Sequence, residues 1–449
     1  MDQDTALERI PDVVGPEGVA AAGAASAYLA DERQLYRGRA ALIVRPKSVD
    51  ECSRVLRLCH DAGIGVVPQG GNTGYCGGAT PFDGDGGRRQ ILLSTSRLNR
   101  IREIDPIGFT MTAEAGVVLA NAQAAAAGED LLFPLSMGSE GSCQLGGNLS
   151  TNAGGLAVLR YGTMRDLALG LEVVLPNGDV MSELKGLRKD NTGYDLKQVF
   201  IGAEGTLGLI TAAVLKLFPA PRARQTAWLA VESPAAACAV LGRARRESGD
   251  QVVSAEYVSR RSLELVLRHV GGARDPLDAP HAHYVLLELA SADDDAALRD
   301  KLERILATGF EAGEVQDGVL AESGPQRDAL WLLRERVPEA ERREGGSVKH
   351  DVSVRISSLP AFIERAEPAL AAIAPHRLSI YGHIGDGNLH FNLLPPEGGS
   401  IEEFRESCAA RLSERVHDVA AALGGSFSAE HGVGVLKAAE LERYESAEA

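Results

Sequence analysis

Three features are scarce or missing in the 449-residue sequence: paired cysteines, clusters of basic residues and long apolar runs. Its six cysteines are dispersed and form no CxxC pair, which is typical of reduced thiols in a cytosolic protein rather than of a disulfide scaffold. The formal net charge is -16 and no Lys/Arg cluster stands out. This charge argues against binding to nucleic acid or to an anionic membrane surface.

No apolar run approaches the ~20 residues that a helix needs to cross a bilayer, so we expect no integral membrane protein. The first residues, Met1-Asp2-Gln3-Asp4, are acidic and precede no apolar signal region. Together with the dispersed cysteines, these absences predict a cytoplasmic protein.

What the sequence does contain is enough material for two or three domains, because a single core rarely organises more than ~250–300 residues. In the first half, Ala40–Val44 predicts a strand, Ser48–Glu51 predicts a capping box that opens a helix, and Gly65–Val67 predicts the next strand. Residues 1–39 before them are predicted to be a helical lead-in.

Glycine-rich segments follow this strand. Pro68–Tyr75 reads PQGGNTGY, and Ser136–Gly155 contains the runs GSEG, LGGN and NAGG. Each glycine in a packed helix costs roughly 1 kcal/mol relative to alanine, so a long ligand lying on bare backbone explains so many glycines better than ordinary turns do. The pattern is neither GxGxxG nor GxxxxGK[ST], which counts against NAD or ATP as that ligand.

The second half alternates strand-like and helix-like segments beyond Pro219 and Pro221, which predict a domain boundary. Apolar runs at 226–231, 252–258 and 284–289 predict strands with helices between them. This alternation predicts an α+β cap in which helices cover one face of a sheet.

Residues 348–356 alternate as a strand. His350 falls on the apolar side, which favours a structural role, whereas Lys349 falls on the polar side and is a candidate to bind an anionic substrate.

The segment Tyr381–Asn392, YGHIGDGNLHFN, lies between two apolar runs and has Asp-Gly at its centre. Asp386-Gly387 predicts a β-hairpin with a type I′ turn. This register places His383 directly opposite His390, with Asn392 on the same face. Two opposed imidazoles form a half-site for a divalent metal. The alternative is a polar loop with one catalytic or solvated histidine.

A second segment, Ser428–Gly434 (SAEHGVG), places Glu430 beside His431 between glycines. Glu430 could complete a His/His/carboxylate set that keeps open positions, which is the pattern of a catalytic metal site. His431 would then be available as a base.

Five segments taken together resemble the flavoproteins of the vanillyl-alcohol oxidase/p-cresol methylhydroxylase (PCMH) superfamily: Pro68–Tyr75, Ser136–Gly155, Phe200–Ile210, Gly382–Asn392 and Ser428–Gly434. Within it the chain is similar to the D-2-hydroxyacid dehydrogenases, above all to the D-2-hydroxyglutarate dehydrogenases. The resemblance implies an α+β protein with a PCMH-type FAD-binding domain of two α/β subdomains at 40–219. It further implies an α+β cap with an antiparallel sheet at 220–423 and a C-terminal helical segment at 424–449 that returns to the flavin, without the family's usual tail.

The resemblance also implies the site residues. FAD would be noncovalent, because members with covalent flavin often have histidine where this chain has Asn72. The implied FAD contacts are Pro68, Gly70, Gly71, Asn72, Thr73, Gly74, Gly138, Ser139, Gly147, Asn148, Asn152, Gly154, Gly155 and Ile210. Zn²⁺ or another divalent metal would be bound by His383, His390 and Glu430, with His431 as the general base. Arg334, Lys349 and Asn392 would contact the substrate.

The implied reaction is oxidation of a D-2-hydroxy acid to the 2-oxo acid with hydride transfer to the flavin. D-2-hydroxyglutarate, or D-malate, is the expected substrate. Pro338 stands where relatives often carry a hydroxyl residue, which leaves open a D-lactate dehydrogenase or a glycolate oxidase subunit. A flavin-free binding or structural protein is the non-enzyme alternative. The expected partners are an electron acceptor, such as an electron-transfer flavoprotein or a quinone, and a second copy in a homodimer.

Overall fold

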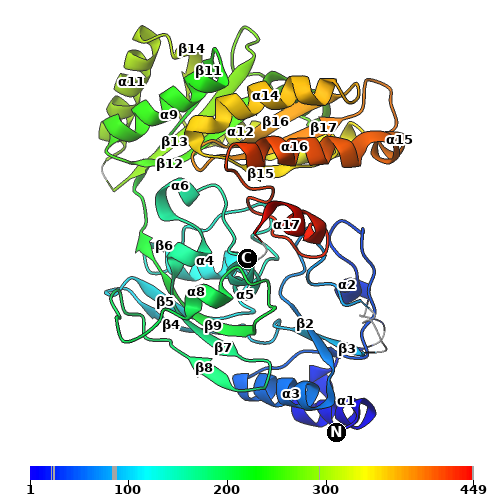
Figure 1. The fold of residues 1–449 in the computed structure, drawn as a ribbon. Helices are drawn as coiled ribbons and strands as arrows, with labels where there is room; N and C mark the ends of the chain where they lie inside the picture. Colours follow the sequence, from blue (N-terminus) through cyan, green and yellow to red (C-terminus); the bar gives the residue numbers. More distant parts are fainter. Residues whose placement is uncertain (22, 24–25, 83–87, 293, 447–449) are drawn as a thin grey trace. The chain divides into compact units, whose positions relative to one another are not determined.

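The computed structural model describes residues 1–21, 23, 26–82, 88–292 and 294–446. The chain forms two compact units (Figure 1). The first contains Met1–Gly155, Tyr161–Ala220 and Glu430–Ala449, and the second contains Leu156–Arg160 and Pro221–Ala429. The second unit is therefore nearly one continuous run of sequence, whereas residues from the end of the chain complete the first.

The N-terminal part of the first unit is a three-stranded parallel sheet with β3 between β1 and β2. The predicted helix start at Ser48 is confirmed, because its side chain accepts the Glu51 N–H and caps α3. The helix ends at Gly63, whose φ of +67° allows the left-handed cap. The elements are α1 (Gln3–Val14), α2 (Ser26–Leu29), β1 (Ile43–Val44), α3 (Val49–Ala62), β2 (Gly65–Gln69) and β3 (Gln90–Ser94).

The rest of the first unit is a five-stranded antiparallel sheet in the order β4-β5-β9-β7-β8, and a short pair, β6 and β10. Its core packs α4, α5 and α7 against β5, β7 and β9. The elements are β4 (Ile101–Asp105), β5 (Thr110–Glu114), α4 (Leu119–Ala127), β6 (Leu131–Leu132), α5 (Leu145–Ser150), α7 (Met164–Leu167), β7 (Ala168–Val174), β8 (Val180–Ser182), α8 (Lys197–Phe200), β9 (Leu209–Lys216), β10 (Phe218–Pro219) and α17 (Ala438–Tyr444). The two predicted α/β subdomains correspond to these two sheets and their helices.

The second unit is built on a seven-stranded antiparallel sheet in the order β14-β11-β13-β12-β16-β17-β15, as predicted for the cap. Its strands are β11 (Ala223–Val231), β12 (Val252–Ser259), β13 (His283–Ser291), β14 (Val315–Leu320), β15 (Asp351–Ser353), β16 (Arg377–His383) and β17 (Asn388–Leu394). Its helices are α9 (Pro234–Ser248), α10 (Arg260–His269), α11 (Asp295–Glu311), α12 (Gly324–Glu335), α13 (Val337–Arg343), α14 (Leu359–Ala371), α15 (Ile401–Phe404) and α16 (Ala410–Ala422), while α6 (Val158–Tyr161) lies where the chain passes between the units.

The prediction that helices cover one face of this sheet is wrong, because both faces carry them. Leu229, Val285 and Phe391 belong to a core shared with α9, α11, α14 and α16. Residues that point the other way, such as Trp228 and Tyr381, belong to a second core shared with α10, α12 and α13. Alternation along β11 and β13 therefore places apolar side chains on both faces, which a period-two pattern cannot reveal.

The predicted hairpin is confirmed as β16 and β17, but its predicted register is wrong. Tyr381, not His383, is opposite His390. The connection has four residues, Ile384 to Gly387, and Gly387 with φ +88° is its one residue in the left-handed region, so the turn is not type I′. Because the register differs by two residues, His383, His390 and Asn392 still share one face.

The inward position of His350 is confirmed, since its ring nitrogens are 2.7 Å from the Phe391 carbonyl oxygen and 2.8 Å from the Ser413 hydroxyl. Among the described residues, no helix is long and apolar enough to span a membrane. The six cysteines all lie in the described part of the chain, and no disulfide joins them.

Candidate functional site

Two glycine-rich segments of the first unit lie against each other through bare backbone. A Cβ at Gly71 would lie 2.0 Å from the Ser142 carbonyl oxygen, and a Cβ at Gly70 would lie 3.5 Å from the Gly147 nitrogen. A side chain at position 71 would collide with backbone, so this close approach requires glycine. The two segments predicted to hold FAD are therefore side by side.

The same region fits a ligand that supplies a hydrogen-bond donor. Asn148 is 4% exposed, and its Oδ1 is buried with no hydrogen-bond partner among the described residues. An unpaired buried acceptor is costly, so a bound group is expected to satisfy it. A Cβ added to Gly74, Gly138 or Gly147 would have no atom of the described residues within 4 Å, so the space beside these three glycines is open. These residues fit an FAD lying on backbone.

Two other predicted FAD residues are bonded within the first unit. Asn72 Nδ2 donates to the carbonyl oxygens of Ala27, at 3.2 Å, and Ala30, at 2.8 Å. Asn152 Oδ1 accepts the Arg165 N–H at 3.0 Å. The remaining predicted contacts are Pro68 in β2, Thr73, Ser139, Gly154 and Gly155 in loops and turns, and Ile210 in β9.

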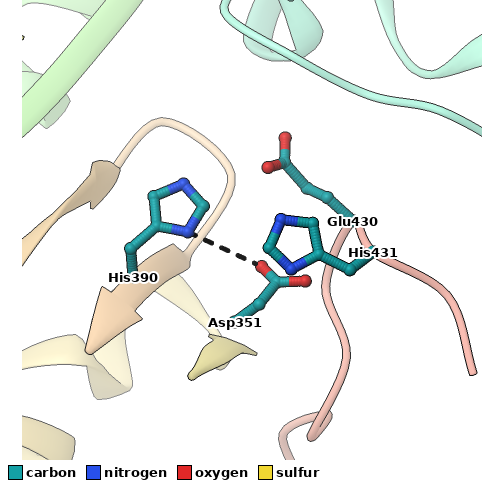
Figure 2. Close-up of side chains that lie close together, drawn as sticks. All are labelled: Asp351, His390, Glu430 and His431. Atoms are coloured by element: carbon teal, nitrogen blue, oxygen red, sulfur yellow. Dashed lines mark ion pairs between the residues drawn. The ribbon is translucent and has the colours of Figure 1, made fainter. Parts of the chain in front are cut away.

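Four potential metal ligands gather in one place: Asp351, His390, Glu430 and His431 (Figure 2). Each offers one ligand atom, and these atoms all lie within 4.8 Å of one another. Two imidazoles and two carboxylates are donors that Zn²⁺ and other divalent ions accept. The group therefore fits a divalent metal, and it contains Asp351, which was not predicted.

The sheet of the second unit places the first two of these donors. Asp351 of β15 is directly opposite His390 of β17, and Asp351 Oδ1 is 4.0 Å from His390 Nδ1. The Ala429 N–H donates to the Asp351 carbonyl oxygen at 3.1 Å. The next two residues of the chain are Glu430 and His431, so this bond anchors the start of their loop.

His383, predicted as a ligand together with His390 and Glu430, lies beside His390. Their ring centroids are 5.7 Å apart, and His383 Nδ1 is 2.8 Å from Glu256 Oε1. Metal-binding histidines commonly donate their other N–H to a carboxylate, which fixes the tautomer. The Glu256 carboxylate accepts from a protonated Nδ1, so in a neutral His383 held this way Nε2 is the nitrogen with the lone pair. His383 is not one of the four residues whose ligand atoms lie within 4.8 Å of one another.

Arg334 of α12 is held by the same buried acid of β12. Its Nε donates to Glu256 Oε2 at 2.8 Å, and its guanidinium carbon is 4.8 Å from the Tyr381 ring centroid. Burial raises the pKa of Glu256, but the charges of His383 and Arg334 outweigh burial and hold the pKa at about 2. Glu256 therefore stays ionised and keeps Arg334 in a fixed position.

The other two predicted substrate residues share a second buried acid. Glu341 of α13 accepts hydrogen bonds from Lys349 Nζ and from Asn392 Nδ2, each at 3.0 Å. Asn392 is 1% exposed, and its Oδ1 accepts the His350 N–H at 3.1 Å. The Lys349 side chain is 35% exposed. Of the two, Lys349 is therefore the better placed to meet an anion.

Three acids of this region, Glu256, Glu341 and Asp351, were not predicted from the sequence. The signal that could have found Glu256 is a carboxylate inside the apolar strand 252–258, because buried carboxylates are almost always paired. Asp351 lies on the polar side of the alternating segment 348–356, next to Lys349, and that pattern could have indicated it.

Comparison with known proteins agrees with this geometry. Residues 40–182 match the family described as FAD binding domain, and residues 220–449 match FAD linked oxidases, C-terminal domain. The chain is 37% identical over 423 residues to the D-2-hydroxyglutarate–pyruvate transhydrogenase of Saccharomyces cerevisiae, covering 92% of this chain and 82% of that protein. It is 37% identical over 409 residues to the D-2-hydroxyglutarate dehydrogenase of Xanthomonas citri pv. viticola, covering 90% of this chain and 84% of that protein.

Among solved structures, p-cresol methylhydroxylase with substrate bound has the same fold, with a TM-score of 0.71 at 17% identity over 96% of this chain and 90% of that chain. The chain therefore belongs to the FAD-linked oxidases of the PCMH type, in the group that contains the D-2-hydroxyglutarate dehydrogenases.

Proposed function

We propose that this chain oxidises a D-2-hydroxy dicarboxylic acid, D-2-hydroxyglutarate in the first place, to its 2-oxo acid. The observation that carries the proposal is the group of Asp351, His390, Glu430 and His431, whose ligand atoms lie within 4.8 Å of one another. Oxidation of a 2-hydroxy acid requires a hydroxyl to lose its proton beside a carboxylate, and this donor set suits a metal that binds both groups.

His390, Glu430 and Asp351 would hold the metal, joined by His383 through Nε2. A divalent ion bound there would lower the pKa of the substrate hydroxyl and neutralise the adjacent carboxylate. We assign His431 as the base that receives the hydroxyl proton. Its ring packs edge-on to Tyr75, with centroids 5.0 Å apart, which restricts its rotation.

FAD, when bound, accepts the hydride from the α-carbon of the acid. The chain's part is to hold the cofactor with the glycine segments and the unpaired Asn148 Oδ1. A second flavoprotein or a quinone would then reoxidise the cofactor.

Arg334 and Lys349 would bind the second carboxylate of the substrate. Glu256 occupies Arg334 Nε, and an arginine has further N–H donors that suit a carboxylate. Tyr381 links this arginine to the donor group, because its ring lies 4.8 Å from the guanidinium carbon and 4.9 Å from the His390 ring centroid. The names of the related enzymes from yeast and Xanthomonas support a five-carbon diacid.

The test is anaerobic reduction of the purified FAD-loaded protein by a panel of acids, followed at the flavin absorption band. D-2-hydroxyglutarate should bleach the flavin faster than D-malate, and both should act faster than D-lactate or glycolate. L-2-hydroxyglutarate is the matched control, because it carries the same charges with the opposite hand. A preference for a monocarboxylate, or no bleaching by any acid, would reject the proposal.

Chelation tests the metal separately. Removing divalent ions should abolish turnover while the flavin spectrum remains, and zinc should restore activity. Active protein that contains no divalent metal by elemental analysis would rule out this role for the donor group.

A further inference from the structure

Glu204 lies in the Phe200–Ile210 segment and has no role in the proposed function. Its carboxylate accepts two backbone N–H groups, from Val433 to Oε1 at 2.7 Å and from Gly434 to Oε2 at 2.8 Å. Both bonds lie within the first unit. Two consecutive amides that point at one carboxylate form a small anion-binding concavity, and charge-assisted bonds of this kind are stronger than neutral ones.

The backbone of the loop depends on this contact. Gly432 has φ +75°, and a Cβ there would lie 2.6 Å from Glu204 Oε1, while Gly434 has φ +50°. Both glycines therefore allow a left-handed turn that presents the amides to the carboxylate. On the other side of the turn, the Cys76 carbonyl oxygen accepts the N–H groups of Val435, at 2.8 Å, and Leu436, at 3.1 Å.

Glu204 is itself held in an uncommon conformation. Its φ is +51°, and its own N–H donates to the Ser150 carbonyl oxygen at 2.7 Å. Ser150 ends α5, the helix that contains Gly147 and Asn148 of the candidate flavin site. A non-glycine residue with positive φ carries a strain that its surroundings must offset, and such residues concentrate at functional sites.

We infer that Glu204 is a positioning residue that fixes the loop of Glu430 and His431 against the segment that carries Asn148. It touches neither substrate nor metal and acts through the backbone of residues 432–434. The inference rests on the proposed function only in giving Glu430 and His431 their roles. The loop geometry itself does not depend on those roles.

The test compares Glu204→Gln with the FAD-loaded wild-type protein. Glutamine keeps the size of the side chain but replaces one acceptor oxygen by a donor NH₂ that opposes a backbone N–H. Zinc affinity should fall about 10- to 100-fold, as is typical when a residue that supports a metal ligand is changed. FAD content should stay the same, the unfolding midpoint should fall because a charge-assisted hydrogen bond is lost, and kcat should fall more than KM rises.

Glu442→Gln is the matched control, because Glu442 is exposed on α17 of the same unit and loses the same charge. It should leave zinc affinity and kcat unchanged. The inference would be overturned if Glu204→Gln bound zinc as tightly as the wild type, or if both variants lost zinc affinity equally.

Hydrogen exchange of residues 430–436 gives a readout that is independent of metal. Exchange in this segment should become faster in Glu204→Gln and stay unchanged in Glu442→Gln. If the wild-type protein binds no zinc at all, the proposed function fails, and loop exchange alone decides the role of Glu204. Should Glu204→Gln not fold, Gly432→Ala disturbs the same contact with Glu204 intact, and it should also accelerate exchange; normal exchange there would contradict the inference.

Discussion

Single residues in the second unit show how buried carboxylates hold basic side chains in place. Glu256 holds Arg334 and His383, and Glu341 holds Lys349. A buried cation is costly unless it is paired, and each acid supplies that pair. Each acid offsets one positive charge beside it, so the number of cations near the site does not by itself count the carboxylates of a substrate.

Arg334→Ala should lower the free energy of unfolding by about 3–5 kcal/mol, because it leaves Glu256 buried without its arginine. Arg327→Ala is the control: Arg327 pairs with Asp328 on the surface, and its loss should cost under about 1 kcal/mol. Urea unfolding measures both. In a double-mutant cycle, adding Glu256→Gln to Arg334→Ala should recover part of the unfolding free energy that Arg334→Ala loses. If the effects of the two substitutions simply add, the pair is not coupled.

Asp351→Asn should weaken zinc binding about 10- to 100-fold, because the variant keeps the shape of the side chain but loses the negative charge. FAD content should not change, since the flavin segments are in the first unit. Asp317→Asn, on the edge strand β14, is the control and should bind zinc as the wild type does. Equal zinc affinity in all three proteins would remove Asp351 from the metal site.

At the scale of elements, the turn between β16 and β17 decides where His390 lies. Gly387 has φ +88°, and a Cβ there would lie 2.0 Å from the Val354 carbonyl oxygen. The turn is therefore packed against the chain that leaves β15, and it needs glycine both for its conformation and for space.

Gly387→Ala should destabilise the protein more than Gly424→Ala does. Gly424 has φ +70° with no atom within 4 Å of the added Cβ, so its substitution should cost only the left-handed strain, roughly 1–2 kcal/mol. The Gly387 variant must also move a carbonyl group, and it should bind zinc more weakly because His390 follows three residues later. Equal unfolding free energies for the two variants would contradict this account of the turn.

Much of the element pattern could be predicted from the sequence, because caps, turns and apolar runs are local. The helix cap at Ser48 and the hairpin around Asp386 are examples. The hairpin register could not be fixed, since Asp-Gly marks a turn but not its length. The pair of Glu256 and His383 joins strands 127 residues apart, and a local pattern carries no information on such a partner.

At the scale of the whole molecule, the flavin should be released by denaturation. Asn72 occupies the position at which covalent relatives often have histidine, and an amide cannot attack the flavin ring. After acid or heat precipitation, the yellow colour should therefore move entirely into the supernatant, and absorbance of the pellet and supernatant measures it. Colour that stays with the pellet would show a covalent link.

The discontinuous first unit has a consequence for biosynthesis. Translation delivers Pro221–Ala429 as one stretch, and this stretch can fold as it leaves the ribosome. The contact between Cys76 Sγ and the Gly432 carbonyl oxygen spans 356 residues, so it forms only after the whole stretch Pro221–Ala429 has been made. Glu430 and His431 are thus made after the strands of every sheet, and a nascent chain can bury its sheets before it can assemble the groups proposed for catalysis.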